Sequence, residues 1–177
     1  MIKHVIFDLG GVLIDLDMPR SMQSFAALGA DPKALLQPAS SATTEGRAKA
    51  TLCDGMVANG AMDLYQTGDI STEDFVSGIQ KFCHPGTTAE QVLEAWNDCL
   101  LDIPASKLEF IRQLRAEGYK VHLLSNTNDA HWVHIAKKHF VCHRENSKCT
   151  ISKGRTRAKG NKRIHIRCTV DNTLCSV

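Results

Sequence analysis

The chain has 177 residues and a mass of 19.5 kDa, of which 43% are hydrophobic and 23% charged. This composition is typical of a globular protein and excludes a disordered or fibrous one. The most apolar stretch near the start, HVIFDLGGVLIDLD, is interrupted by Asp8, Asp15 and Asp17. We therefore expect neither a secretory signal nor a membrane span, and predict a cytoplasmic protein with no membrane partner.

Charge and cysteine are distributed unevenly along the chain. Residues 141–177 contain nine Lys or Arg and two acids, a net charge of +7, whereas the whole chain has a net charge of only +2. Four of the seven cysteines lie in the same segment, in two pairs that each enclose six residues: Cys142, Cys149, Cys168 and Cys175. Structural zinc sites favour shorter spacings, so we do not expect a zinc centre. The asymmetry indicates a basic tail, or a foreign segment, joined to an acidic domain.

Two short apolar runs, at residues 3–7 and 120–124, predict strands of a parallel sheet that are buried on both faces. The first run ends in Asp8, and the second ends in Ser125, Asn126 and Thr127. Polar side chains therefore follow the carboxyl ends of both strands.

Between these strands the sequence predicts helices at residues 18–28, up to about Tyr65, at 71–82, 88–101 and 106–117. Ser71 and Asp74 have the spacing of a helix N-cap with an acid three residues later. Residues 38–60 show no clear period, and we expect loop and weak helix there. After Phe140 the pattern fails, and RIHIRCTV predicts at best a half-exposed strand.

At the motif level, VIFDLGGVLIDLD resembles motif I of the haloacid dehalogenase-like (HAD) hydrolases, and LLSNTN at residues 123–128 resembles their motif II. The resemblance is greatest to the sugar-phosphate phosphatase branch, such as bacterial α-glucose-1-phosphate phosphatases, and covers about residues 1–140. It implies an α/β fold: a HAD-like Rossmannoid parallel sheet, incomplete here, with an inserted helical cap. Residues 1–15 and 99–140 would form the partial core, residues 16–98 the cap, and residues 141–177 a tail outside the native family sequence.

The resemblance also implies roles for four residues. Asp8 matches the nucleophile that forms an aspartyl-phosphate and a ligand of Mg²⁺, and the carbonyl of Gly10 matches a second ligand. Ser125 matches the hydroxyl that holds a phosphate oxygen, and Asn126 the amide beside it. From the residues alone, Asp8 also fits a turn or a helix cap, and the Ser-Asn-Thr-Asn run also fits a helix N-cap, which is itself an anion site.

The sequence departs from the family pattern in two places. Gly10 stands where most members have the aspartate that serves as general acid and base, so that role is unassigned. The lysine that usually precedes Pro-Asp, and the acidic pair that completes the metal site, have no match, so we expect weak Mg²⁺ binding or none. For Asp15 and Asp17 we expect a solvated turn, and for His131 and His134 surface or substrate-facing positions without a metal.

The favoured hypothesis is a phosphate-monoester phosphatase for a small phosphorylated metabolite, impaired in a chain that is truncated or frame-shifted after about residue 140. Such a chain should hydrolyse p-nitrophenyl phosphate far more slowly than an intact relative. The alternative is a nucleic-acid-binding protein that uses the basic tail on an inactive HAD-like scaffold. No aromatic residue follows Phe140 to stack on bases, which argues against a nucleic-acid partner. The substrate and the oligomeric state stay open.

Overall fold

The computed structural model describes residues 3–35, 60–139, 149–155 and 162–169. The chain divides into two compact units. We call the first the core unit (Met1–Leu16, Leu100–Gly154 and Ile164–Val177) and the second the helical unit (Asp17–Cys99 and Arg155–Arg163).

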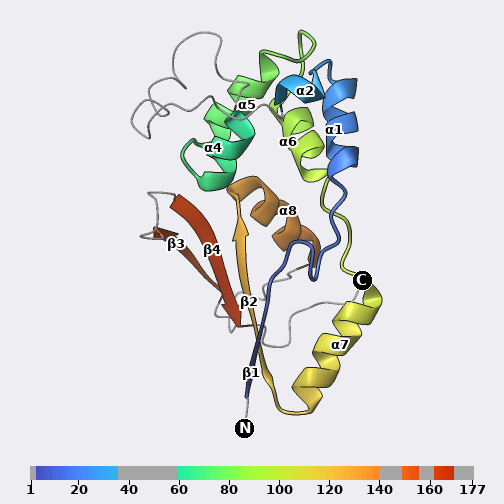
Figure 1. The fold of residues 1–177 in the computed structure, drawn as a ribbon, viewed down its shortest axis with the longest axis vertical. Coiled ribbons are helices and arrows are strands. Elements are labelled where there is room, and N and C mark those ends of the chain that lie inside the picture. Colours follow the sequence, from blue (N-terminus) through green and yellow to red (C-terminus); the bar gives the residue numbers. More distant parts are fainter. Residues whose placement is uncertain (1–2, 36–59, 140–148, 156–161, 170–177) are drawn as a thin grey trace. The chain divides into compact units, whose positions relative to one another are not determined.

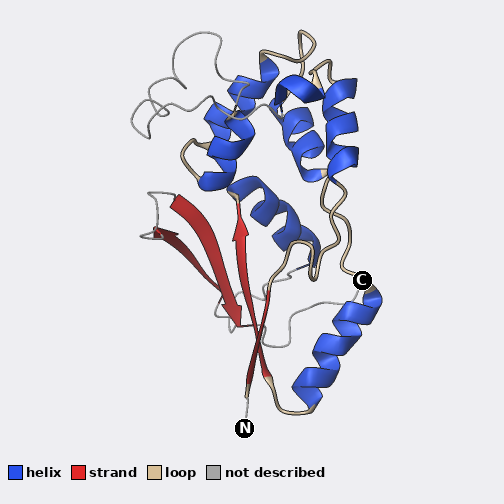
Figure 2. Cartoon of the chain, viewed as in Figure 1, coloured by secondary structure: helices blue, strands red, loops and turns tan. Residues whose placement is uncertain are grey.

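The sheet contains β1 (His4–Phe7), β2 (Lys120–Thr127), β3 (Cys149–Arg155) and β4 (Lys162–Thr169), in the order β1-β2-β4-β3 (Figures 1 and 2). β1 and β2 are parallel neighbours, with His4 opposite Lys120 and Phe7 opposite Leu123. The α/β fold and the adjacency of the two motif-bearing strands are therefore confirmed.

The sequence prediction was wrong about the end of β2 and about its burial. β2 continues to Thr127, three residues past Leu124, because β4 pairs with it antiparallel and places Ser125 opposite Ile166. Of the side chains predicted to be buried on both faces, Ile6 is 63% exposed and Leu124 45% exposed. The reason is that the described helices cover only the other face.

The face of β1 and β2 that the helices cover contributes to the hydrophobic cluster of the core unit. α7 (Ala105–Ala116) and α8 (Asp129–His139) contribute Ile111 and Ile135, which are 1% and 3% exposed. They join Val121 and Leu123 of β2, each 2% exposed. The full cluster is Leu9, Leu13, Ile14, Ile103, Ile111, Val121, Leu123 and Ile135. Since burial of each such side chain contributes about 1.5–3 kcal/mol, this cluster fixes β1 and β2 in place.

Between Asp17 and Cys99 of the helical unit, every regular element that the structure describes is a helix. The elements are α1 (Met18–Ala27), α2 (Pro32–Leu35), α4 (Ala61–Thr67), α5 (Thr72–Gln80) and α6 (Ala89–Asn97). Capping boxes begin α5 at Ser71 and α6 at Thr88, because each side chain accepts a backbone N–H three residues later and the third residue returns a bond. The predicted cap at Ser71 is confirmed.

Aromatic rings form the centre of the helical unit. Tyr65 stacks on Phe75 with ring centroids 4.5 Å apart, and Phe75 lies 5.0 Å from Trp96. The buried Ser21 hydroxyl donates to the carbonyl of Ala95 at 2.7 Å, which joins α1 to α6. These contacts make α1, α4, α5 and α6 one packed group.

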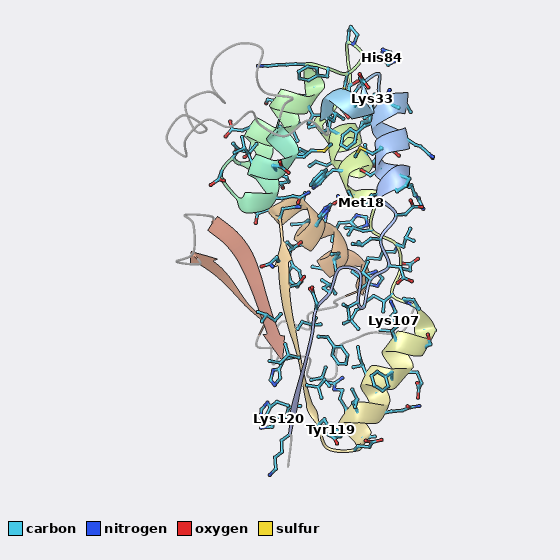
Figure 3. All side chains as sticks on the ribbon, viewed as in Figure 1. Met18, Lys33, His84, Lys107, Tyr119 and Lys120 are labelled. Carbon is cyan, nitrogen blue, oxygen red and sulfur yellow. The ribbon has the colours of Figure 1, made fainter. Side chains whose placement is uncertain are left out.

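The segments that lead into and out of the helical unit run antiparallel. The amide of Asp17 donates to the carbonyl of Cys99 at 2.8 Å, and the amide of Leu101 donates to the carbonyl of Asp15 at 2.9 Å. Both acids also have partners within the chain, although Asp15 is exposed. Asp17 caps α1 through the amide of Arg20, and Asp15 pairs at 2.7 Å with Lys107, labelled in Figure 3.

No helix in the described part of the chain is long and apolar enough to cross a membrane. Of the segment at residues 38–60, which the sequence predicts as loop and weak helix, residues 38–59 lie outside the described residues, as do Cys142 and Cys175 of the tail.

Candidate active site

Asp8 lies directly after β1, at its carboxyl end, and its side chain is exposed. One carboxylate oxygen, Oδ1, accepts the amide N–H of Leu9 at 2.7 Å. Leu9 itself is 2% exposed and belongs to the hydrophobic core. The hydrophobic core therefore anchors the chain one residue after Asp8. The hydrogen bond from the Leu9 amide then orients the Asp8 carboxylate.

A tight turn follows Asp8. The carbonyl of Leu9 accepts the amides of Leu13 at 2.9 Å and Ile14 at 2.8 Å, and the amide of Gly11 donates to the carbonyl of Ile14 at 2.8 Å. Gly11 has φ +73°, a conformation that favours glycine, whereas Gly10 does not. A Cβ atom on Gly10 would meet its nearest neighbour, Cδ1 of Leu16, at an ordinary 3.7 Å. The turn thus requires glycine at position 11 and has room for a side chain at position 10.

Ser125 and Asn126 lie inside β2, near its carboxyl end, rather than after it. Ser125 is 6% exposed and shares the buried face with Leu123, while Asn126 is exposed. The residue that caps the next helix is Asn128, which is 3% exposed. Its Oδ1 accepts the amide of His131 at 2.9 Å, so the N-cap interpretation of the Ser-Asn-Thr-Asn run holds at its last residue. The signal in the sequence is an Asn directly before the helical run DAHWVHIA.

The parallel register brings the two motifs to one edge of the sheet. Asp8 comes one residue after Phe7, and Ser125 two residues after its partner Leu123. With strands 4.8 Å apart and 3.3 Å per residue, the backbones at Asp8 and Ser125 are separated by about 6 Å. Convergence of the two side chains on one cleft stays a prediction, since Asp8 is exposed and Ser125 lies with the buried face.

Two histidines of α8 lie downstream of this edge. Burial, together with the smaller effect of the neighbouring charge of His134, lowers the pKa of His131 to about 4. His131 is therefore a neutral imidazole at pH 7. At the other end of α8, Lys138 pairs with Asp102 at 2.7 Å and lowers the pKa of that carboxyl. This ion pair joins the C-terminal end of α8 to the segment at residues 101–104, which precedes α7.

The described residues include the two magnesium ligands that the motif resemblance implies. Asp8 and the carbonyl of Gly10 are oxygen donors of the kind that Mg²⁺ prefers. Within residues 3–35, 60–139 and the two described tail strands, however, no group of three or more His, Cys, Asp or Glu could hold a metal ion. The donors fit the ion in kind but do not complete its coordination.

An α/β core with an exposed aspartate at the end of its first strand, and a buried serine near the end of the adjacent parallel strand, is the architecture that the motifs predicted. The chain matches the haloacid dehalogenase-like hydrolase family over residues 2–164 and belongs to this family. The family match extends past residue 140, the limit of the motif resemblance.

Among known proteins, the chain is 31% identical over 129 residues to D-ribitol-5-phosphate phosphatase of Bacteroides thetaiotaomicron. The alignment covers 72% of this chain and 54% of that protein, so the chain spans about half the length of this relative. A HAD family enzyme of the same organism, solved with magnesium and inorganic phosphate, has a TM-score of 0.57 and 33% identity, covering 79% of this chain and 61% of that one. A HAD-like hydrolase of Porphyromonas gingivalis has a TM-score of 0.52 and 32% identity, covering 73% and 54%.

Proposed function

We propose that this chain carries the nucleophile half of a phosphatase site that acts on phosphate monoesters of sugars or sugar alcohols. The observation that carries the proposal is the position of Asp8 at the carboxyl end of β1, beside β2 with its Ser125, in a chain of the HAD family. The relative that hydrolyses D-ribitol 5-phosphate supports a phosphorylated polyol or sugar as the substrate class.

In this proposal the Asp8 carboxylate attacks phosphorus and forms an aspartyl-phosphate, while the sugar leaves as its alkoxide or alcohol. The amide of Leu9, which donates to Oδ1, leaves the second oxygen, Oδ2, as the attacking atom. The hydroxyl of Ser125 and the amide of Asn126 would hold phosphate oxygens. Water then hydrolyses the aspartyl-phosphate and releases phosphate.

Asp8 and the Gly10 carbonyl would hold Mg²⁺, which when bound offsets the negative charge of the phosphoryl group. Among the described residues, no group of three or more His, Cys, Asp or Glu could complete this site, and position 10 carries no general acid. We therefore propose that turnover by this chain is lower than that of the Bacteroides relative by about 100-fold or more, the usual cost of losing one contact to the reacting group.

A trapping experiment tests the nucleophile separately from turnover. The chain is incubated with Mg²⁺ and acetyl phosphate, and its peptides are mapped by mass spectrometry for an acyl-phosphate. We expect the label on the peptide that contains Asp8. The label should disappear in Asp8→Asn and persist in Asp15→Asn, a matched control. A label elsewhere, or none, would show that Asp8 is not the nucleophile.

Turnover is measured in parallel on ribitol 5-phosphate and p-nitrophenyl phosphate, with the Bacteroides phosphatase in the same assay. We expect slow hydrolysis by this chain, and little further loss in Asp8→Asn because the residual rate is already near background. Turnover equal to that of the relative, and abolished by Asp8→Asn, would overturn the proposed impairment.

The helical unit interrupts the chain between β1 and β2, as a cap would. We propose that it closes over the Asp8 site and excludes water during the reaction. The alternative of nucleic-acid binding depends on the side chains of residues 141–177, which lie outside those described.

A further inference from the structure

Two histidines that the proposed reaction does not use lie together on the exposed face of the β1–β2 pair. Nδ1 of His4 is 2.8 Å from Nε2 of His122. The ring centroids are 5.1 Å apart and the ring planes differ by 13°. The two imidazoles are therefore nearly coplanar and meet nitrogen to nitrogen, although 118 positions separate them in the sequence.

The sheet register produces this pair. His4 is opposite Lys120 and His122 is opposite Ile6, so the histidines are diagonal neighbours on one face. Diagonal neighbours on adjacent strands are within reach of ring side chains. Because the backbone positions belong to paired strands, the two rings are held near each other without a cost in loop ordering when a ligand binds.

We propose that His4 and His122 form a bidentate site for a divalent transition-metal cation of the Ni²⁺ or Cu²⁺ type. Neutral imidazole is a preferred ligand of these ions. With metal–nitrogen distances of about 2.0–2.1 Å, nitrogens 2.8 Å apart subtend an angle of roughly 85° at the ion. That angle suits adjacent positions of square-planar or octahedral coordination better than the wider angle of a tetrahedral Zn²⁺ site.

Binding needs a change of tautomer but no net loss of a proton. In the present pair one ring donates its N–H to the lone pair of the other. For both lone pairs to face the ion, that hydrogen moves, by exchange with water, to the other nitrogen of its own ring. Rotations of roughly 45° by the two partly exposed rings then point both lone pairs at the ion, at metal–nitrogen distances of about 2.0–2.1 Å, and water completes its coordination.

One charged group on the same face opposes binding. Lys120, labelled in Figure 3, is the register partner of His4 and is exposed. Its ammonium group repels a divalent ion at this position. Asp8 lies four residues after His4, about 13 Å along the strand, which separates this site from the proposed Mg²⁺ site.

The test is a titration of the reduced full chain with Ni²⁺ by isothermal calorimetry. We expect His4→Ala and His122→Ala each to raise the Kd by on the order of tenfold, and His84→Ala, a change of an exposed histidine in the helical unit, to leave it unchanged. Lys120→Gln should lower the Kd. Excess Mg²⁺ should not displace Ni²⁺, because Mg²⁺ prefers oxygen ligands.

A second measurement uses the unaltered chain. Paramagnetic Ni²⁺ should broaden the ring signals of His4 and His122 in NMR spectra before those of the other histidines. Equal binding by wild type and both alanine variants, loss in only one of them, or first broadening at other histidines would each overturn the proposal. His4→Gln and His122→Gln, which keep similar size and polarity, replace the alanine variants if those fail to fold.

Discussion

The amide of Gly11 donates a hydrogen bond to the carbonyl of Ile14 at 2.8 Å, and Gly11 has φ +73° to make it. The turn after Asp8 therefore depends on glycine at position 11. At position 10, φ lies outside the left-handed region and the nearest atom to an added Cβ is 3.7 Å away. The two adjacent glycines have different structural roles.

This difference predicts different costs for the same substitution. Gly11→Ala should destabilise the fold by about 1–2 kcal/mol, the cost of a left-handed conformation for an L-residue. Gly10→Ala should change the free energy of unfolding by less than about 1 kcal/mol. Urea denaturation of both variants measures the difference. Equal costs would show that the turn does not distinguish the two positions.

Asn128 provides a second prediction, at the start of α8. Its buried side chain accepts the amide of His131, so Asn128→Ala should cost about 1–2 kcal/mol. Asn128→Ser, which retains a capping oxygen, should cost a fraction of that. Thermal and urea denaturation of the two variants provide the comparison. An equal loss in both would mean that capping is not the role of this side chain.

Gly29 is close to an aromatic ring in the helical unit. A Cβ atom there would lie 2.8–2.9 Å from three ring atoms of His84, and Gly29 has φ +91°. Gly86 has nearly the same φ, +90°, with no atom within 4 Å of an added Cβ. We expect Gly86→Ala to cost about 1–2 kcal/mol from strain alone. Gly29→Ala should cost about 1–3 kcal/mol more, because the ring must move.

The double variant Gly29→Ala/His84→Ala separates these two contributions. Removing the ring should recover the steric part of the Gly29→Ala cost and leave the part that comes from φ. Denaturation of the single and double variants completes the cycle. If His84→Ala gives no recovery, the ring is not the source of the added cost.

The lowered pKa of His131 makes stability depend on pH. The folded pKa is about 4 and the ordinary value 6.5, so the unfolded chain binds more protons between these values. Stability should be fully present above pH 6.5 and fall as the pH drops toward 4, by on the order of 2–3 kcal/mol in total. The free energies of unfolding at pH 7 and at pH 5 should differ less from each other in His131→Gln than in wild type. An unchanged difference between the two pH values would assign the loss to other groups.

Local signals in the sequence predicted much of this fold. The Ser71–Asp74 spacing predicted the start of α5, and the apolar run before Asp8 predicted β1. The pairing of Ser125 with Ile166, which lengthens β2, joins residues 41 positions apart and has no local signal. The exposure of Ile6 was missed for a similar reason, because burial depends on which helices cover a face. For the candidate site, motifs pointed to Asp8 and Ser125, and their roles there stay predictions. The His4–His122 pair, in contrast, arises only from strand register.

The hydrogen bond between the amide of Asp17 and the carbonyl of Cys99 has a consequence for the order of folding. Phe7 and Leu123 pair across 116 positions of sequence, and pairing so distant in the chain is slow. Residues 17–99 form a unit whose ends meet at this bond. If that unit folds first, the loop that β1 and β2 must close shrinks to about 34 positions, which lowers its entropic cost by about 1 kcal/mol. An insertion that folds first would thereby shorten the search for strand pairing.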